Sequence, residues 1–108
     1  VAYLTEAGYR PVDIGVYLLC GMPGQSAVEV RESIAYVSQC GARPILAEYS
    51  PIPGTALWSD AVRESADPIS LEPLYQNNSL LPCRNRNLTY EMYRHCQAMT
   101  RIVKAGIA

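Results

Sequence analysis

Residues 17–26, with the sequence YLLCGMPGQS, decide the fold of this chain. An apolar run is followed at once by glycine and proline, and then by Ser26, a residue type that often caps a helix. A buried parallel strand that ends beside a helix N-terminus has this pattern, and ligands commonly bind at such strand ends. A second apolar stretch ends in a similar way at residues 48–55, EYSPIPGT. Together the two ends predict one edge of a ligand site.

Around this segment the sequence predicts a strand, a helix and a second strand. Residues 12–20 carry apolar side chains on both faces, as expected for a strand covered on both sides. Ser26 begins a capping box, and apolar residues then recur at helical spacing as far as Gly41. Residues 44–49 predict the second strand. Residues 1–64 are therefore expected to contain one βαβ unit, with a parallel sheet.

The remaining residues predict a long loop and a terminal helix. A short helix is expected at residues 56–64, and residues 65–87 are rich in Asp, Pro, Asn and Ser. A loop of this length in a compact domain is usually functional or disordered, and we expect it to contact a substrate or a partner domain. Residues 88–106 show helical apolar periodicity, with Asn87 as the expected N-cap and Gly106 as the expected C-cap.

The composition of the chain is that of a globular protein. Hydrophobic residues make up 49% of its 108 residues, charged residues make up 18%, and the net charge is -1. This charge gives no basis for binding nucleic acid or an anionic membrane. No apolar run reaches the roughly 20 residues that a membrane-spanning helix needs. The four cysteines lack the spacing of a zinc or iron–sulfur motif, so we expect free thiols in a cytoplasmic protein.

Residues 1–8 predict the end of a helix that Gly8 closes. Because a natural start rarely falls inside a helix, we expect the chain to be part of a longer protein, whose N-terminal part is its first partner. A fragment with an unpaired strand edge and partly bare apolar faces is expected to associate with itself as a homo-oligomer.

Residues 18–25, LLCGMPGQ, resemble the fifth-strand motif of radical S-adenosylmethionine (radical SAM) enzymes. In that motif an apolar strand ends in Gly-Leu/Phe-Pro-Gly-Glu/Gln, and a helix follows. Residues 47–55, AEYSPIPGT, resemble the sixth strand of the same family and its Pro-Gly-Thr turn. Residues 74–79, LYQNNS, are similar to a segment of members with an N-terminal cobalamin-binding domain. The resemblance covers about the whole chain, as the carboxyl-terminal part of the radical SAM domain.

The resemblance implies an α/β fold that is a fragment of a partial (β/α) barrel, with about two parallel strands and flanking helices. It also implies that the parent enzyme uses a [4Fe–4S] cluster to cleave S-adenosylmethionine reductively to a 5′-deoxyadenosyl radical, with cobalamin as a further cofactor in one subgroup. The family binds the cluster through Cys-x3-Cys-x2-Cys, which this chain lacks. The fragment alone is therefore expected to be inactive and to bind none of these cofactors.

Six residues of this chain match family positions that surround the adenosine. Leu19 and Gly21 match fifth-strand positions that pack near the adenine, and Gln25 matches a position that is often Glu in the family. Residues 48–50 match the end of the sixth strand, where backbone groups meet the adenine. Gly21 is expected to let the backbone pass close to a flat ring, and the N–H groups after Ser26 are expected to favour a partial negative charge. The candidate cofactor-binding residues are Leu19, Gly21, Gln25, Glu48, Tyr49 and Ser50.

Two other interpretations of the sequence stay open. The glycine-rich turn would equally suit a non-catalytic α/β binding or interaction module that holds an anion or nothing. Alternatively, Glu48 would be the general base of a complete small enzyme, which requires a closed pocket within these residues. The single histidine, His95, has no carboxylate or serine partner at motif spacing, so the sequence does not support a nucleophilic triad.

Overall fold

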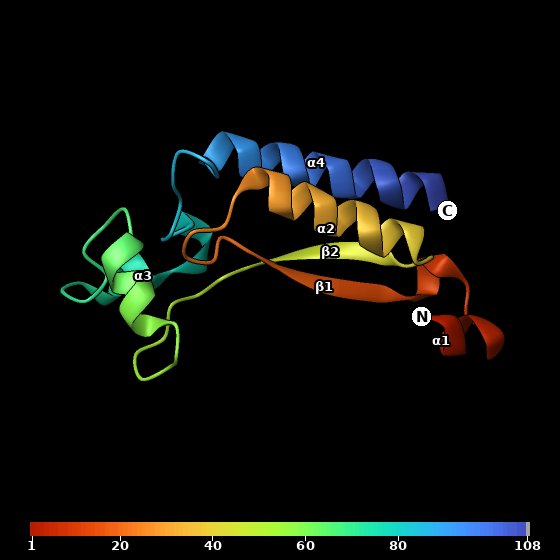
Figure 1. Ribbon diagram of the computed structural model, residues 1–108, viewed down its shortest axis with the longest axis horizontal. Coiled ribbons are helices and arrows are strands. Elements are labelled where there is room, and N and C mark those ends of the chain that lie inside the picture. Colours follow the sequence, from red (N-terminus) through yellow and green to blue (C-terminus); the bar gives the residue numbers. More distant parts are fainter. Residues whose placement is uncertain (108) are drawn as a thin grey trace.

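The computed structural model describes residues 1–107 and shows a mixed α/β chain in two layers. Two strands form a parallel sheet, and two long helices lie together on one side of it (Figure 1). The expected α/β class and the parallel pair of strands are confirmed. In chain order the helices and strands are α1 (Ala2–Glu6), β1 (Gly15–Cys20), α2 (Ala27–Gln39), β2 (Arg43–Glu48), α3 (Trp58–Glu64) and α4 (Tyr90–Ile107).

Strands β1 and β2 pair in register along their whole length. Gly15 lies opposite Arg43 at one end of the ladder, and Cys20 lies opposite Glu48 at the other. Strand β1 is shorter than the sequence predicts, because Pro11–Asp13 forms a single 3-10 turn before it. The sheet is thus six residues long on each strand, and both strands end at the same level.

Helix α2 begins where the capping box predicts. Ser26 has an extended backbone, and its hydroxyl oxygen accepts a hydrogen bond from the N–H of Glu29 at 3.3 Å. The helix ends before Gly41, whose φ of +83° suits glycine better than any other residue. Its apolar residues face the sheet, so the sequence predicts this helix correctly in position and orientation.

The sheet is covered on one face only, which corrects the expected coverage on both sides. Residues paired in a parallel sheet point to the same face, so Tyr17 shares a face with Ile45, and Leu19 shares it with Ala47. Tyr17 is 74% exposed and Leu19 is 53% exposed. Helices α2 and α4 both lie on the opposite side (Figure 1). We refer to the face that carries these four residues as the open face.

The main core lies between the other face of the sheet and helices α2 and α4. It contains residues from both strands and both helices, together with two residues from the segment between α3 and α4. The partly buried methionines of α4 pack against it, which confirms the apolar stripe expected for the terminal helix. Its buried members are Cys20, Ala27, Val30, Ile34, Leu81, Leu88, Tyr93 and Cys96.

Helix α4 begins and ends later than the sequence indicates. Thr89, rather than Asn87, caps the helix, because its hydroxyl oxygen accepts a hydrogen bond from the N–H of Met92 at 3.2 Å. Gly106 lies inside the helix, which continues to Ile107, and therefore does not cap it. Leu88, just before the cap, is fully buried in the core together with Tyr93, and this contact holds the first turn against the sheet.

Residues 65–87 form a packed segment rather than a loose loop. Two short 3-10 turns, at Pro73–Gln76 and Asn78–Leu80, shorten it, and Leu81 has a left-handed backbone with φ +52°. Ile69 and Cys83 are buried against helix α3 in a second small core. The sequence did not show this packing, because the apolar residues that make it have no regular period.

The amino-terminal helix ends as its glycine predicts. Gly8 has φ +98°, its N–H donates to the carbonyl of Thr5, and the N–H of Tyr9 donates to the carbonyl of Leu4 at 3.0 Å. This pair of bonds is the Schellman arrangement. Within residues 1–107, no helix is both long enough and apolar enough to cross a bilayer.

Candidate ligand site at the carboxyl end of the sheet

The two strand ends that the sequence singles out lie next to each other. The ladder continues one step past the strands, because the N–H of Tyr49 donates to the carbonyl of Cys20 at 2.8 Å. The segments that follow β1 and β2 therefore leave the sheet at the same end and on neighbouring strands. The spatial relation on which the sequence interpretation depends is thus present in the molecule.

The turn after β1 is closed by the side chain of Gln25. Its Oε1 accepts hydrogen bonds from the N–H of Gly21 at 2.7 Å and from that of Met22 at 3.3 Å. Its Nε2 donates to the carbonyl of Leu19 at 3.2 Å. Both ends of the amide are used within the turn, so Gln25 stabilises the turn rather than pointing outward to a ligand.

Gly21 is required by contacts within the chain itself. Its φ is +91°, and a Cβ added there would lie 2.8 Å from Cδ1 of Leu81. The sequence predicts that a flat ring of the ligand lies close to Gly21, but in the structure the side chain of Leu81 lies against the position where a Cβ of residue 21 would be. Gly24, with φ +75°, supplies the second left-handed position of the same turn.

Two of the first N–H groups of helix α2 are already bonded within the chain. The N–H of Ala27 donates to the carbonyl of Asn87 at 2.7 Å, and Ser26 already takes the N–H of Glu29. The side chain of Asn85 also reaches this turn, where its Nδ2 donates to the carbonyl of Gln25 at 3.1 Å. The chain therefore bonds the N–H groups of Ala27 and Glu29 with its own carbonyl and hydroxyl groups.

The three residues at the end of β2 point in different directions. Tyr49 is only 8% exposed and packs with Ala61, Ile69 and Cys83, and burial raises the pKa of its phenol. Its hydroxyl group has no hydrogen-bond partner among the described residues. Ser50 is exposed, and its hydroxyl donates to the carbonyl of Gln76 at 3.4 Å.

Glu48 faces helix α4 and not the open face. The hydroxyl of Tyr93 donates to its Oε1, and Nε2 of Gln97 donates to the oxygen of Tyr93 at 3.0 Å. Burial, and then the hydrogen bond to Glu48, raise the pKa of Tyr93 above its usual value. These three side chains link the end of β2 to the first turns of α4.

Three of the six candidate residues line pockets, and these pockets lie on opposite edges of the sheet. Leu19 and Gln25 line a pocket of about 340 Å³ along the unpaired edge of β1, together with Tyr17 and Met22. Glu48 lines a different pocket of about 330 Å³ beside α4. The structure therefore brings the backbone of the six candidates together at one end of the sheet, while their side chains belong to separate surroundings.

Sequence reasoning missed the residues that organise this end of the molecule. Leu81 and Asn85 come from the segment expected to be a loop, and no local pattern shows that they return to the first turn. Tyr93 and Gln97 are four residues apart on α4, a spacing that predicts contact between them. Their partner Glu48 is 45 residues away in the chain, so no sequence signal connects it to them.

Three of the four cysteines, Cys20, Cys83 and Cys96, are buried, and Cys40 is exposed. Burial raises the pKa of Cys20 to about 12 and that of Cys83 to about 11. No group of three His, Cys, Asp or Glu side chains among the described residues is arranged to hold a metal ion.

Comparison with known proteins gives no assignment. The chain matches no protein family, no curated protein and no solved structure.

Proposed function

We propose that this chain is the carboxyl-terminal part of a radical SAM enzyme and forms the wall of the site that faces the adenosine of S-adenosylmethionine. The observation that supports the proposal most directly is the convergence of the two motif-bearing strand ends, where Tyr49 donates to Cys20 across the ladder. Parallel strands bind ligands at this end, so the resemblance and the geometry concern the same place.

The one-sided helix layer is consistent with this proposal. In a (β/α) barrel, helices cover the outer face of each strand, and the inner face turns toward the lumen. Helices α2 and α4 would be the outer layer, and the open face with Tyr17 and Leu19 would be the inner one. A doubly wound sheet would instead carry helices on both faces.

The residues of this chain would act by binding and positioning. Leu19 would supply apolar contact to the adenine, and the backbone of Glu48–Ser50 would hydrogen bond to its edge. Gln25 would hold the turn in shape from within, since its amide already bonds Leu19 and Gly21. In the parent protein, the [4Fe–4S] cluster would supply the electron that cleaves S-adenosylmethionine.

The test is to produce the longer parent protein anaerobically, reconstitute it with iron and sulfide, and measure 5′-deoxyadenosine after reduction. Leu19→Asn should raise the KM for S-adenosylmethionine about tenfold, because it removes apolar contact worth roughly 1–2 kcal/mol. Val28→Asn is the matched control, since Val28 is also 53% exposed but lies on the helix side. Absence of 5′-deoxyadenosine from the wild-type protein would overturn the proposal.

A second candidate function is a non-catalytic α/β interaction module. It is favoured by the internal hydrogen bonds of Gln25 and by the bond from Ala27 to Asn87, which leave the turn closed on itself. The coding sequence upstream of Val1 separates the two candidates. A Cys-x3-Cys-x2-Cys segment there supports the enzyme, and its absence supports the interaction module.

A further inference from the structure

Strand β2 has an unpaired edge on the side away from β1. The N–H groups of Arg43 and Tyr49 both donate to the β1 side, and the ladder alternates every two residues. The N–H groups of Leu46 and Glu48 therefore point to the opposite edge, as does the carbonyl of Pro44. Within residues 1–107, no third strand pairs there.

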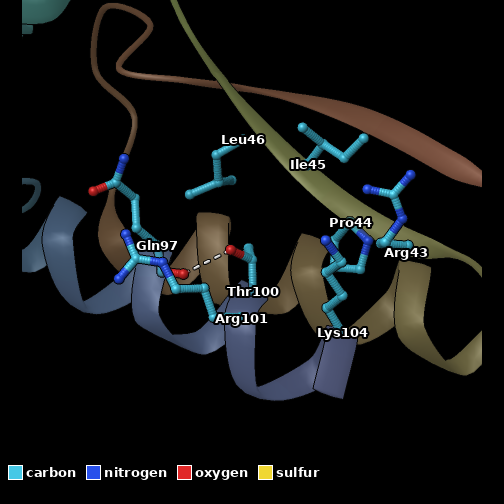
Figure 2. Close-up of a pocket in the computed structure, with 8 residues that line it drawn as sticks. All are labelled: Arg43, Pro44, Ile45, Leu46, Gln97, Thr100, Arg101 and Lys104. Atoms are coloured by element: carbon cyan, nitrogen blue, oxygen red, sulfur yellow. Dashed lines mark hydrogen bonds between the residues drawn. The ribbon is translucent and has the colours of Figure 1, made fainter. Parts of the chain in front are cut away.

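A groove runs along this edge between β2 and helix α4. One part of it, about 230 Å³ in volume, is lined by residues of β2 and by Gln97, Thr100, Arg101 and Lys104 (Figure 2). The pocket beside Glu48 shares Gln97 and Arg101 with it, so the two pockets adjoin each other along this edge. We refer to the two together as the edge groove.

The edge groove is positively charged along the helix side. Arg94, Arg101 and Lys104 are exposed, and none of them makes an ion pair with a described carboxylate, since the ion pairs of the described residues involve other arginines. Arg43 lies at the end of the groove, with its Nε bound to the carbonyl of Val12 at 3.3 Å. Glu48 is the one described carboxylate that lines the groove, and Tyr93 already donates to it.

These cations are spread along the groove and do not converge on one point. In Figure 2 the side chain of Arg101 extends toward Gln97, whereas that of Lys104 extends toward Pro44. Side chains on one face of an extended peptide recur every ~7 Å, whereas Arg101 and Lys104 are separated by a rise of ~4.5 Å along the helix. Their long, flexible side chains can span this difference, so two acidic residues of a strand could each pair with one cation. A single small anion would require the cations to point together.

We propose that the edge groove binds an extended acidic peptide segment, which adds as a strand to the free edge of β2. The backbone groups of Leu46 and Glu48 would hydrogen bond to the segment, and Arg101 and Lys104 would pair with its Asp or Glu side chains. The positive charges oppose pairing with a basic strand, so the groove favours acidic sequences. Pro44 has no N–H and offers the added strand only its carbonyl. This inference does not depend on the proposed function.

The position of Glu48 predicts the register of the bound segment. A carboxylate next to Glu48 would be repelled, so the acidic residues of the segment would lie toward Lys104 and an uncharged residue would lie beside Glu48. Glu48→Gln should therefore strengthen the binding of a peptide that is acidic along its whole length, by about threefold at low salt.

The test uses the full chain and a fluorescein-labelled peptide of about eight residues that alternates Glu and Val, with binding followed by fluorescence anisotropy. The double variant R101E/K104E should weaken binding by at least about tenfold. The matched control R31E/R86E makes the same change in net charge at exposed positions outside the groove and should bind as the wild type does. Circular dichroism confirms that both variants are folded.

Further measurements decide whether the ligand is an acidic strand. A Glu–Val peptide that is N-methylated at alternate residues should bind more weakly, and the amide signals of Leu46 and Glu48 should shift more on binding than those of Ile45 and Ala47. Equal binding of a Lys–Val peptide, or equal binding of the N-methylated peptide, would overturn the proposal. Tighter binding of a single-stranded oligothymidine, or displacement by dilute inorganic phosphate, would also overturn it, because either result assigns the groove to another kind of anion.

Discussion

Gly21 shows how two constraints meet at a single residue. Its backbone is left-handed, and a methyl group in place of its hydrogen would lie 2.8 Å from Cδ1 of Leu81. Gly21→Ala should therefore destabilise the fold by roughly 2–4 kcal/mol, the sum of backbone strain and a contact that requires Leu81 to move. Urea unfolding followed by circular dichroism measures this loss.

Gly54→Ala is the matched control for that substitution. Gly54 has a similar φ of +83°, but a Cβ there would meet no atom within 4 Å. Gly54→Ala should lower the free energy of unfolding by only about 1–2 kcal/mol, the cost of the strained backbone. Equal losses in the two variants would show that the contact with Leu81 contributes nothing.

Cys20 predicts a loss of stability in alkaline solution. It is fully buried, and burial raises the pKa of its thiol from 9.0 to about 12. Between these values the unfolded chain releases a proton that the folded chain keeps, so the stability falls as the pH rises. The urea midpoint should decline from pH 8 to about pH 10.5, and less steeply in Cys20→Ala. Replacing the exposed Cys40 should leave the slope as it is in the wild type.

At the scale of elements, Tyr93 joins helix α4 to strand β2. Tyr93→Phe removes the hydroxyl that donates to Glu48 and accepts from Gln97. The free energy of unfolding should fall by about 1.5–3 kcal/mol, because the partly buried carboxylate of Glu48 loses its hydrogen-bond donor. Urea unfolding of the variant checks this value.

Tyr90→Phe provides the comparison for Tyr93→Phe. Tyr90 lies one turn earlier on the same helix and is 41% exposed. Tyr90→Phe should change the free energy of unfolding by no more than about 0.5 kcal/mol, as most surface substitutions do. If both variants lose the same amount, the bond to Glu48 does not hold α4 on the sheet.

Elements with strong local signals could be predicted from the sequence. The capping box at Ser26, the apolar period of α2 and the Gly8 cap each depend on residues within one or two turns, and all three are confirmed. The start of α4 was placed too early, because Asn87 and Thr89 are both good caps and only the tertiary position of Leu88 separates them. Long-range partners such as Asn85 and Gln25 leave no local pattern.

At the scale of the whole molecule, the open face predicts self-association. Tyr17 and Leu19 expose apolar surface on a sheet whose outer edges pair with no other strand of residues 1–107. Burial of this surface against a second copy would be favourable. The chain should sediment as a dimer or larger species, and the double variant Y17K/L19K should sediment as a monomer.

Val28→Lys combined with Tyr36→Lys is the control for self-association. Both residues are exposed on helix α2, at 53% and 68%, and lie on the other side of the sheet. This variant should sediment as the wild type does. A wild-type chain that stays monomeric over a wide range of concentration would contradict the prediction.

The sequence could not show which face of the sheet is bare. Residues 15–20 carry apolar side chains on both faces, and this pattern indicates a strand that could be buried on both faces. The pattern does not show on which face the helices of this chain pack. Helices α2 and α4 both pack on the side of Leu18, so the residues on the side of Leu19 stay exposed. The face on which Glu48 lies could not be predicted either, because it depends on the pairing of Glu48 with Cys20 and not on residues close in sequence.

The bonds from Asn85 to Gln25 and from Ala27 to Asn87 tie two distant segments of the chain together at the carboxyl end of the sheet. A ligand that arrives at this end would meet groups that are already ordered, so little conformational entropy would be lost on binding. Calorimetry of such a ligand should then give a small change in heat capacity, in proportion to the apolar area it covers and without the larger change that accompanies coupled folding.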